Sequence, residues 1–413
     1  MRGVIWLVLL FVVAVVAATT LGSNDGLVSI YWGGWRTDLS LNLSVILLLG
    51  TCAVLMSAVK AIDSLISLPK RAGEWRALRR ERAAQAALRE AQAEYFGARY
   101  GRASKAAHKA LEIQQDTPQL AADAQFRMLA QLLAAASLHR LQDRKQRDAT
   151  LGQALGAARR GPSGADEPVR LLAAEWALDD RDAPRALQML EGLPPGAARR
   201  TQALRLKLQA TRMARQPLEA LHTARLLANH QAFSPAVAQS LLRALAAETM
   251  EATHDVQQLR RLWGQFDSAD RRDAHIASRM AQRAVHLDAD DDARTWLRPF
   301  WERLPELPRE DREQVALALI DARSGIAADW LPRLESAVQS FGHEAAVVAA
   351  VGMVFAERRL WGKARKLLEQ AAAAPALPTR TRRLAWRQLA ALAREESDEA
   401  RAVACERAAA GLD

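Results

Sequence analysis

The stretch "AAVVAAVGMVFAERRLWGKARKLLEQAAAAPALP", Ala345–Pro378, decides the fold class of this chain. It contains two helical segments separated by a short polar break, with small and large apolar residues recurring at helical spacing. The small residues let two antiparallel helices approach closely, and the large ones fill the interface with the next helix pair. This packing signature consists of Gly352, Phe355, Trp361, Ala364, Leu368 and Ala371.

The spacing resembles the tetratricopeptide repeat, in which a small residue of the first helix precedes an alanine of the second by twelve positions. The same pattern recurs around Ala174 and Ala186, and again 34 residues later around Ala220. Weaker copies centre on Ala103 and Ala293, whereas residues 234–274 show helical periodicity without a clean motif. We therefore predict a mainly α protein in which residues 84–413 form an α-solenoid, as one block or as two with a break near 234–274.

The composition is consistent with a helical protein that binds an acidic partner. Half of the residues are apolar but only 5% are aromatic, and the formal net charge is +10. A positive charge of this size favours anionic lipid or nucleic acid. The two cysteines, Cys52 and Cys405, cannot build a disulfide framework or a CxxC metal site, which fits a reducing compartment.

Two apolar runs near the N-terminus predict membrane spans. Gly3 to Gly22 is uncharged and long enough to cross the hydrocarbon core, although it also has features of a signal peptide. Leu43 to Val59 forms the second run and would anchor the chain in either case. The predicted segments are 1–22 and 43–62 as spans, 23–42 as the loop between them, 63–83 as a basic juxtamembrane segment and 84–413 as the repeat domain.

The basic segment sets the predicted topology. Seven basic residues against three acidic ones lie between Lys60 and Arg82, directly after the second run. Lys60, Lys70 and Arg71 are expected to contact anionic headgroups at the interface. By the positive-inside rule both termini are cytoplasmic and residues 23–42 face the other side, as in a multi-pass protein of a bacterial inner membrane.

The loop between the spans predicts a β-hairpin in "GLVSIYWGGWRTDLSLN", Gly26 to Asn42. A Gly33-Gly34 turn pairs Trp32 with Trp35, and the alternation then continues outward. The remaining predicted pairs are Tyr31–Arg36, Ile30–Thr37, Ser29–Asp38 and Val28–Leu39. Tyr31, Trp32 and Trp35 are expected to be interfacial anchors of a connector, with a ligand site as the alternative.

No motif in the sequence predicts a reaction. The dinucleotide, phosphate-loop, zinc-protease and nucleophile-elbow patterns are absent, as is the CxxCH haem attachment. Asp288, Asp290 and Asp292 lack the glycine and glutamate of a calcium loop and instead predict a helix-capping turn. The histidines are scattered singly: His108, His139, His222, His230, His254, His275, His286 and His343.

We therefore expect a non-enzymatic protein without a bound cofactor or metal. A basic group near Trp386 could contact phosphates, but it lies on a predicted repeat helix whose outer face must be solvated. Nucleic acid is thus not an expected partner. The members of this group are Arg380, Arg382, Arg383 and Arg387.

The layout as a whole resembles the HemY-type inner-membrane proteins of proteobacteria. The resemblance rests on the initial span, on "YWGGWRTDLSLNLSV" leading into a second span, on the basic segment, on the Trp-containing stretch Leu259 to Leu297, and on the repeat tail. It implies a role in late haem (porphyrin) biosynthesis and supplies no catalytic residues. The flavoprotein oxidase that shares the name in some bacteria would need a dinucleotide fingerprint, which this chain lacks.

Three functions remain open at this point. The first is a membrane-anchored scaffold that binds haem-biosynthesis enzymes through the repeat groove. The second is a tetrapyrrole-binding carrier that uses histidines and a basic groove. The third is an envelope assembly scaffold unconnected with haem, since a repeat fold does not dictate its partners. The oligomeric state is left open by all three.

Overall fold

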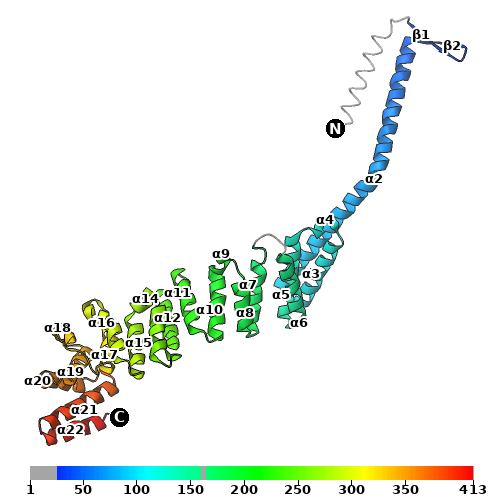
Figure 1. Cartoon of the computed structure of the whole chain (residues 1–413). Helices are drawn as coiled ribbons and strands as arrows, with labels where there is room; N and C mark the ends of the chain where they lie inside the picture. The colour runs from blue at the N-terminus through cyan, green and yellow to red at the C-terminus, as the bar shows by residue number, and fades with distance from the viewer. Residues whose placement is uncertain (1–25, 160–163, 413) are drawn as a thin grey trace. The chain divides into compact units, whose positions relative to one another are not determined.

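The computed structural model describes residues 26–159 and 164–412, in two compact units, Met1–Gly161 and Pro162–Asp413 (Figure 1). The described residues form a single two-stranded hairpin followed by many helices, so the predicted mainly α class with an N-terminal hairpin is confirmed. The first predicted span, Gly3 to Gly22, lies outside the described residues. The 234–274 region, where a break between repeat blocks was expected, lies within the second unit.

The hairpin joins β1 (Leu27–Trp32) to β2 (Trp35–Ser40). Its register contains every predicted pair, from Trp32 with Trp35 at the turn to Val28 with Leu39. Gly33 and Gly34 have φ of +58° and +87°, the positive values that a tight two-residue hairpin turn requires at both central positions. The glycine pair thus fixes the register, as the sequence predicts.

A single helix, α2 (Leu41–Phe96), follows the hairpin directly and is 56 residues long. The Leu41 amide donates to the Gly26 carbonyl at 2.8 Å, which ties the start of the hairpin to the start of the helix. Its segment Leu41–Ile62 has a mean hydropathy of 2.3, and none of its residues is buried. Among the described residues, only this segment is long and apolar enough to cross a membrane. At 1.5 Å per residue these 22 residues span about 33 Å.

The helix continues through the predicted boundaries at 62 and 83, so neither position separates structural elements. The residues after Gly73 are rich in alanine, arginine and glutamate, which are strong helix formers, so the helix continues past the end of the apolar run. The helix ends only at Gly97, and Ala98 then adopts a φ of +57°.

In the first unit, α2 packs against two further helices through alanines. The partners are α3 (Tyr100–Gln115) and α5 (Ala124–Arg140), with α4 (Pro118–Ala121) between them and α6 (Arg144–Ala158) after them. Small side chains allow close helix approach, and they recur on all three helices with full burial. These alanines are Ala84, Ala91, Ala103, Ala107, Ala110, Ala130 and Ala134.

The second unit is a succession of helix pairs (Figure 1). Most consecutive helices pack on each other across short turns, as α15 and α16 do, and first helices also pack on the first helices of the next pair, as α15, α17 and α19 do. This geometry fits a tetratricopeptide-like repeat. The helices are α7 (Glu167–Asp179), α8 (Ala183–Glu191), α9 (Pro195–Ala198), α10 (Thr201–Met213), α11 (Pro217–Asn229), α12 (Pro235–Glu251), α13 (Val256–Gln265), α14 (Ser268–Arg271), α15 (Ala274–His286), α16 (Asp290–Glu302), α17 (Arg309–Asp321), α18 (Leu331–Phe341), α19 (Ala345–Glu357), α20 (Trp361–Ala373), α21 (Thr379–Glu395) and α22 (Glu399–Ala410), with 3₁₀ turns η1 (Leu304–Glu306) and η2 (Ala328–Trp330).

Most turns within these pairs use a left-handed residue that is not glycine. Such residues have φ between +55° and +61°, a region that costs a side chain roughly 1–2 kcal/mol. Each directly precedes the N-cap residue of the second helix, so the tight reversal requires it. These residues are Arg181, Arg215, Asp288, Arg359 and Ser397.

Ion pairs connect neighbouring repeats at nearly constant sequence separation. Arg243 on α12 pairs with Asp273 at the start of α15, 30 residues on, and Arg312 on α17 pairs with Glu344 at the start of α19, 32 residues on. The second helices follow the same rule, since Arg260 on α13 reaches Asp292 on α16 across 32 residues. Further pairs with separations of 28 to 33 are Lys363–Glu335, Arg401–Glu369 and Arg200–Glu167.

Candidate functional site

The repeat-packing residues named from the sequence lie between the helices of one pair. A Cβ atom added to Gly352 on α19 would lie 3.1 Å from the Cβ of Leu367 on α20, so only glycine fits this contact without a shift. Ala364, Leu368 and Ala371 are fully buried on α20, and Phe355 is buried on α19. Trp361 is half-buried at the start of α20 and packs against the same core.

The corresponding alanines of the earlier repeats are also inaccessible. Ala174 on α7 and Ala186 on α8 belong to one buried cluster, and Ala220 on α11 belongs to the large core that continues to the C-terminal helices. All three have zero exposed surface. These residues pack helices together and have no exposed surface that a ligand could contact.

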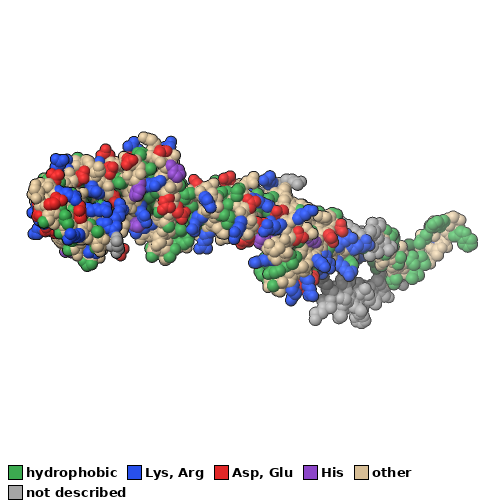
Figure 2. Space-filling view, turned by 90° about the horizontal axis from the view of Figure 1, so that it is seen from below, with side chains coloured by type: hydrophobic (Ala, Val, Ile, Leu, Met, Phe, Trp, Pro, Cys, Tyr) green, Lys and Arg blue, Asp and Glu red, His purple; other side chains and the backbone are tan. Residues whose placement is uncertain are grey.

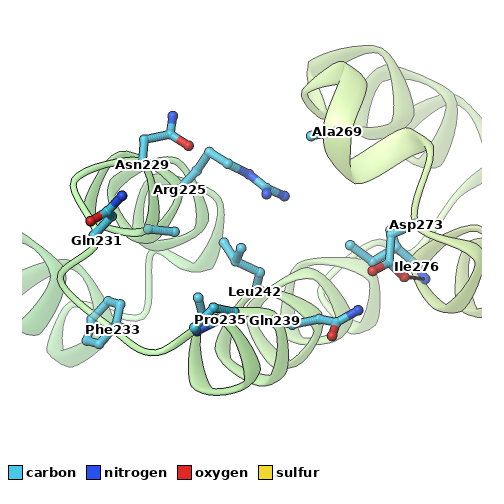
Figure 3. Close-up of a pocket in the computed structure, with 12 residues that line it drawn as sticks. Arg225, Asn229, Gln231, Phe233, Pro235, Gln239, Leu242, Ala269, Asp273 and Ile276 are labelled. Carbon is cyan, nitrogen blue, oxygen red and sulfur yellow. Dashed lines mark hydrogen bonds between the residues drawn. The ribbon is translucent and has the colours of Figure 1, made fainter.

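A cavity in this region is lined by residues of α11, α12, α14 and α15 and of the turns between them (Figure 3). The cavity measures about 660 Å³, and its lining residues fall between positions 225 and 276. Small side chains, among them Ala228, Ala238 and Ala269, form parts of its wall and leave the space open. Phe233, Leu242 and Ile276 supply the apolar surface.

The segment between α11 and α12 shapes one side of the cavity. Gln231 takes a φ of +54°, which reverses the chain after α11. Ser234 then caps α12 by accepting from the Val237 amide at 3.4 Å, and Pro235 occupies the first helical position, where its fixed φ suits the helix. This turn holds Phe233 half-buried against the core.

Charged groups in and beside the cavity are paired. Arg225 extends from α11 across the gap toward the side that carries Ala269 and Asp273, and its guanidinium forms an ion pair with the buried Asp270 of α14 (Figure 3). Burial lowers the pKa of Arg225, while the carboxylates of Asp267 and Asp273 oppose this effect. The guanidinium stays charged, because arginine does not lose its proton in proteins.

Asp273 already forms hydrogen bonds and an ion pair with the helices around it. Its carboxylate caps α15 by accepting from the amides of His275 and Ile276, and it pairs with Arg243 of α12 at 3.0 Å. Arg243 also reaches Asp311 of α17 at 3.5 Å. This network fixes the helices on one side of the cavity and leaves little charge for a ligand.

Three carboxamides remain available at the cavity. Asn229 and Gln231 lie on the α11 side and Gln239 lies on α12 (Figure 3). All three are exposed, and within the described part of the chain none of them forms a hydrogen bond. A carboxamide can donate and accept at once, which matches the alternating N–H and C=O groups of a peptide backbone. The cavity is therefore suited to a polypeptide segment with an apolar side chain.

The predicted capping turn at residues 287–294 is only partly correct. Asp290, Asp291 and Asp292 occupy the first turn of α16, where carboxylates complement the helix dipole. The N-cap is Ala289, however, and no side chain caps this helix. The aspartates pair with arginines instead, Asp291 with Arg294 and Asp292 with Arg260.

The residues expected at the membrane interface are found at the hairpin and on α2. Tyr31, Trp32 and Trp35 are each more than 70% exposed, and the Arg36 guanidinium lies 5.7 Å from the Tyr31 ring centroid. Hydrogen bonds from Ser29 and then Arg36 lower the pKa of Asp38. Lys60 is exposed on α2, and the side chains of Lys70 and Arg71 lie outside the described residues.

The space-filling view shows apolar side chains over the exposed membrane-length part of the chain (Figure 2). Ile46, Leu47, Leu48, Leu49 and Val54 are each more than 60% exposed in this segment. Because water would penalise such a surface, a lipid environment accounts for it.

Metal-binding geometry is not present in the described residues, where no three His, Cys, Asp or Glu side chains come together. The histidines stay apart: His108 contacts the Ser104 carbonyl, His286 the Gln282 carbonyl and His139 the Arg147 guanidinium. Burial raises the pKa of the Cys405 thiol.

Sequence reasoning missed the cavity and the inter-repeat ion pairs. The cavity lies at the junction between the repeat around Ala220 and residues 234–274, which match the motif poorly, and that junction was the available signal. The ion pairs had a signal too, since opposite charges recur about 30 residues apart.

Comparison with known proteins found a family match for the N-terminal part of the described chain. Residues 26–142, from the hairpin through α5, match the family described as "HemY protein N-terminus". The expected resemblance to HemY-type proteins is thereby confirmed for this part of the chain. No curated protein matches the sequence.

Among solved structures, the Naa15/Naa10 complex bound to HypK-THB is similar at 12% sequence identity and a TM-score of 0.25. The alignment covers 76% of this chain and 56% of that one, so this chain spans little more than half of its length.

Proposed function

Because residues 26–142 carry the HemY N-terminal match, we propose that this protein is a membrane-anchored, non-enzymatic scaffold in late haem biosynthesis. Its partners are the haem-biosynthesis enzymes themselves, and it binds a polypeptide segment of such an enzyme in the cavity between α11, α12 and α15. The observation that carries the binding role is the set of unpartnered carboxamides, Asn229, Gln231 and Gln239, around an apolar recess. No cofactor is needed for this role.

The anchor explains why a scaffold would be useful here. Two spans, residues 1–22 and the segment around Leu41–Ile62, would place both termini in the cytoplasm of a bacterial inner membrane. Lys60, Lys70 and Arg71 would then hold anionic headgroups. Enzymes bound to an anchored protein stay near the bilayer, where hydrophobic porphyrins partition, and this raises their effective concentration.

A triple variant tests the scaffold function. In cells we replace Asn229, Gln231 and Gln239 by alanine in the full chain, fuse a proximity-labelling enzyme to its C-terminus, and measure labelled proteins, porphyrin intermediates and haem. The expected result is loss of labelling of haem-biosynthesis enzymes together with a change in porphyrin levels. The matched control replaces Gln188, Gln202 and Gln257, which are exposed on α8, α10 and α13 away from the cavity.

Two outcomes contradict the proposal. If the cavity variant keeps the wild-type labelling pattern, the cavity is not the partner site. If deletion of the whole gene leaves porphyrins and haem unchanged while envelope proteins are labelled, the protein is an envelope scaffold unconnected with haem.

A tetrapyrrole carrier is the second candidate, favoured by a smaller pocket of about 300 Å³. His286, Arg279 and Arg283 of α15 line it together with Arg380 of α21. An imidazole is an axial ligand for haem iron, and arginines pair with carboxylates, although Arg380 already pairs with Asp321 and Arg283 donates to the Thr253 carbonyl. The full chain titrated with haemin should then show a saturable Soret shift that His286→Ala abolishes, whereas non-saturable uptake eliminates the carrier function.

A further inference from the structure

We propose that a recess between α16 and α18 binds a proline-rich segment of a partner protein. The recess measures about 340 Å³ and is lined by the end of α16, the turn η1 and α18. It shares no lining residue with the cavity beside α11, so it would be a second, separate docking site.

Ring-shaped side chains form the apolar wall of this recess. Trp301 is buried at the end of α16, and Phe341 is half-buried at the end of α18. The Arg312 guanidinium lies 4.5 Å from the Phe341 ring centroid, which adds to the contacts that fix this ring. Pro305 and Pro332 line the recess too, each in the first turn of its helix, where the fixed proline φ suits the backbone. The wall therefore offers preformed ring surfaces against which another proline ring can pack.

An unpartnered hydrogen-bond donor belongs to this wall. Trp301 is 3% exposed, and its indole N–H has no acceptor within the described part of the chain. An indole nitrogen can only donate, and a buried donor without an acceptor costs about 1–3 kcal/mol. A carbonyl oxygen brought into the recess can offset this cost. The wall thus favours a ligand that supplies acceptors.

The rim of the recess also offers donors. Ser336 and Ser340 are exposed one helical turn apart on α18, and their hydroxyls form no hydrogen bond with any described residue. Glu302 supplies the carboxylate of the lining, and this carboxylate already pairs with Arg298 at 3.3 Å and with Arg333 at 3.1 Å. The recess therefore combines free donors with a carboxylate acceptor that is occupied.

A proline-rich segment matches this combination better than an ordinary peptide does. Proline has no N–H, and the carbonyl oxygens of a polyproline II helix form no internal hydrogen bonds, so the segment presents acceptors and almost no donors. An ordinary peptide would bring N–H groups that need acceptors of their own. A charged ligand gains little, because Arg333 and Glu302 neutralise each other. Grooves lined by aromatic rings are also the usual docking surface for polyproline II segments.

Binding of a proline peptide tests the inference. The full chain, purified in a neutral detergent, is titrated with a fluorescent octaproline and, separately, with a fluorescent alanine peptide of the same length. Octaproline should bind saturably and at least about tenfold more tightly than the alanine peptide, because proline adds ring contacts and brings no N–H groups.

Three variants separate the recess from the rest of the surface. Ser336→Ala/Ser340→Ala removes two donors at exposed positions and should weaken octaproline binding by about fivefold or more without lowering the melting temperature. Trp301→Phe keeps an aromatic ring, removes the N–H and should weaken binding by a similar factor. The matched control Ser240→Ala/Ser268→Ala changes two exposed serines of α12 and α14 that do not line the recess, and it should bind octaproline like wild type.

The contrary results are equally specific. Equal affinity for the two peptides, no saturable octaproline binding, or undiminished binding by Ser336→Ala/Ser340→Ala overturns the inference. Weakening of the same size in the Ser240→Ala/Ser268→Ala control does so as well. If the triple carboxamide variant loses octaproline binding instead, the peptide lies in the cavity beside α11, and the inference is wrong.

The recess is independent of the haem assignment. A carboxamide variant that loses its labelling of haem-biosynthesis enzymes but still binds octaproline supports two separate partner surfaces. A serine variant that loses octaproline binding while it labels these enzymes normally supports the same conclusion from the other side.

Discussion

The two units differ in the side chains that fill the interfaces between their helices. In the unit that contains α2, fully buried alanines on α2, α3 and α5 make the helix contacts. In the unit after Pro162, buried alanines are joined by leucine, phenylalanine, methionine and tryptophan in one large core, and ion pairs join successive repeats. Close helix contacts through small residues are thus common to both units, whereas large buried side chains and ion pairs between repeats are more prominent in the second. Stability measurements can separate these two modes.

Truncation of a large core residue should have the largest effect. Phe300 on α16 is 1% exposed, and Phe300→Ala is expected to lower the free energy of unfolding by about 3–5 kcal/mol, because transfer and cavity costs add. Urea unfolding measures the loss, and hydrogen exchange of individual peptides should place it in the second unit. Phe96→Ala, whose ring is 85% exposed, is the control and should change stability by less than about 0.5 kcal/mol.

Removal of one buried charge partner should come next. Glu344 is buried at the start of α19, its carboxylate accepts from the Arg312 Nε at 3.0 Å, and Arg312 also lies over the Phe341 ring. Arg312→Met leaves that carboxylate buried without its partner and should lower the free energy of unfolding by about 3 kcal/mol. The double variant Arg312→Met/Glu344→Met should regain most of this loss in stability. Lys363→Met breaks the exposed pair with Glu335 and should cost less than about 1 kcal/mol. Similar losses in both single variants would show that burial does not set the strength of these pairs.

Added volume should harm the alanine-packed unit. Ala107 on α3 has no exposed surface, and Ala107→Leu should destabilise by about 1–3 kcal/mol because the helices must separate. The loss should appear as faster hydrogen exchange in α2, α3 and α5. Ala86→Leu on the exposed face of α2 is the matched change and should leave exchange unaltered. An unaffected Ala107→Leu variant would mean that the contact is looser than its burial implies.

The smallest effect should be a pH dependence of the free energy of unfolding, caused by His275 where α12, α15 and α17 meet. Burial is the main cause that lowers the pKa of His275, helped by Arg243 and Arg279 and opposed by Asp273 and Asp311. Since the unfolded chain protonates first, the contribution to stability is present above pH 6.5 and is lost as the pH falls toward the folded pKa. Urea midpoints between about pH 7.5 and 5 should therefore depend on pH less in His275→Gln than in wild type. Parallel profiles would remove His275 as the cause.

The parts of the fold that the sequence predicts are those governed by local rules. The Gly33-Gly34 pair determines the hairpin register, and the spacing of Gly352 and Ala364 marks two helices that pack closely. The length of α2 was not predicted, because the apolar run and the charged run favour the same helix for different reasons and their junction looks like a boundary. Turns built on Arg181 or Arg359 were missed because a left-handed arginine has no sequence signature.

The candidate site was harder to predict than the fold. Its polar residues Asn229, Gln231 and Gln239 are ordinary surface types, and they become a group only when α11 and α12 bring them around one cavity. The buried pair of Arg225 with Asp270 depends on contact between helices that no local pattern specifies. The basic group near Trp386 was visible in the sequence as a cluster, but the ion pair of Arg380 with Asp321 of α17 could not be predicted from it.

The nearly constant spacing of the inter-repeat ion pairs has a consequence for how such a chain can change in length. Each pair joins one repeat to the next, with partners 28 to 33 residues apart. Duplication of one whole repeat would reproduce both halves of such an interaction and leave these charges matched. An insertion or deletion of a single helix would instead strand an arginine and a carboxylate at once, so whole-repeat duplication is the route by which this array can grow without penalty.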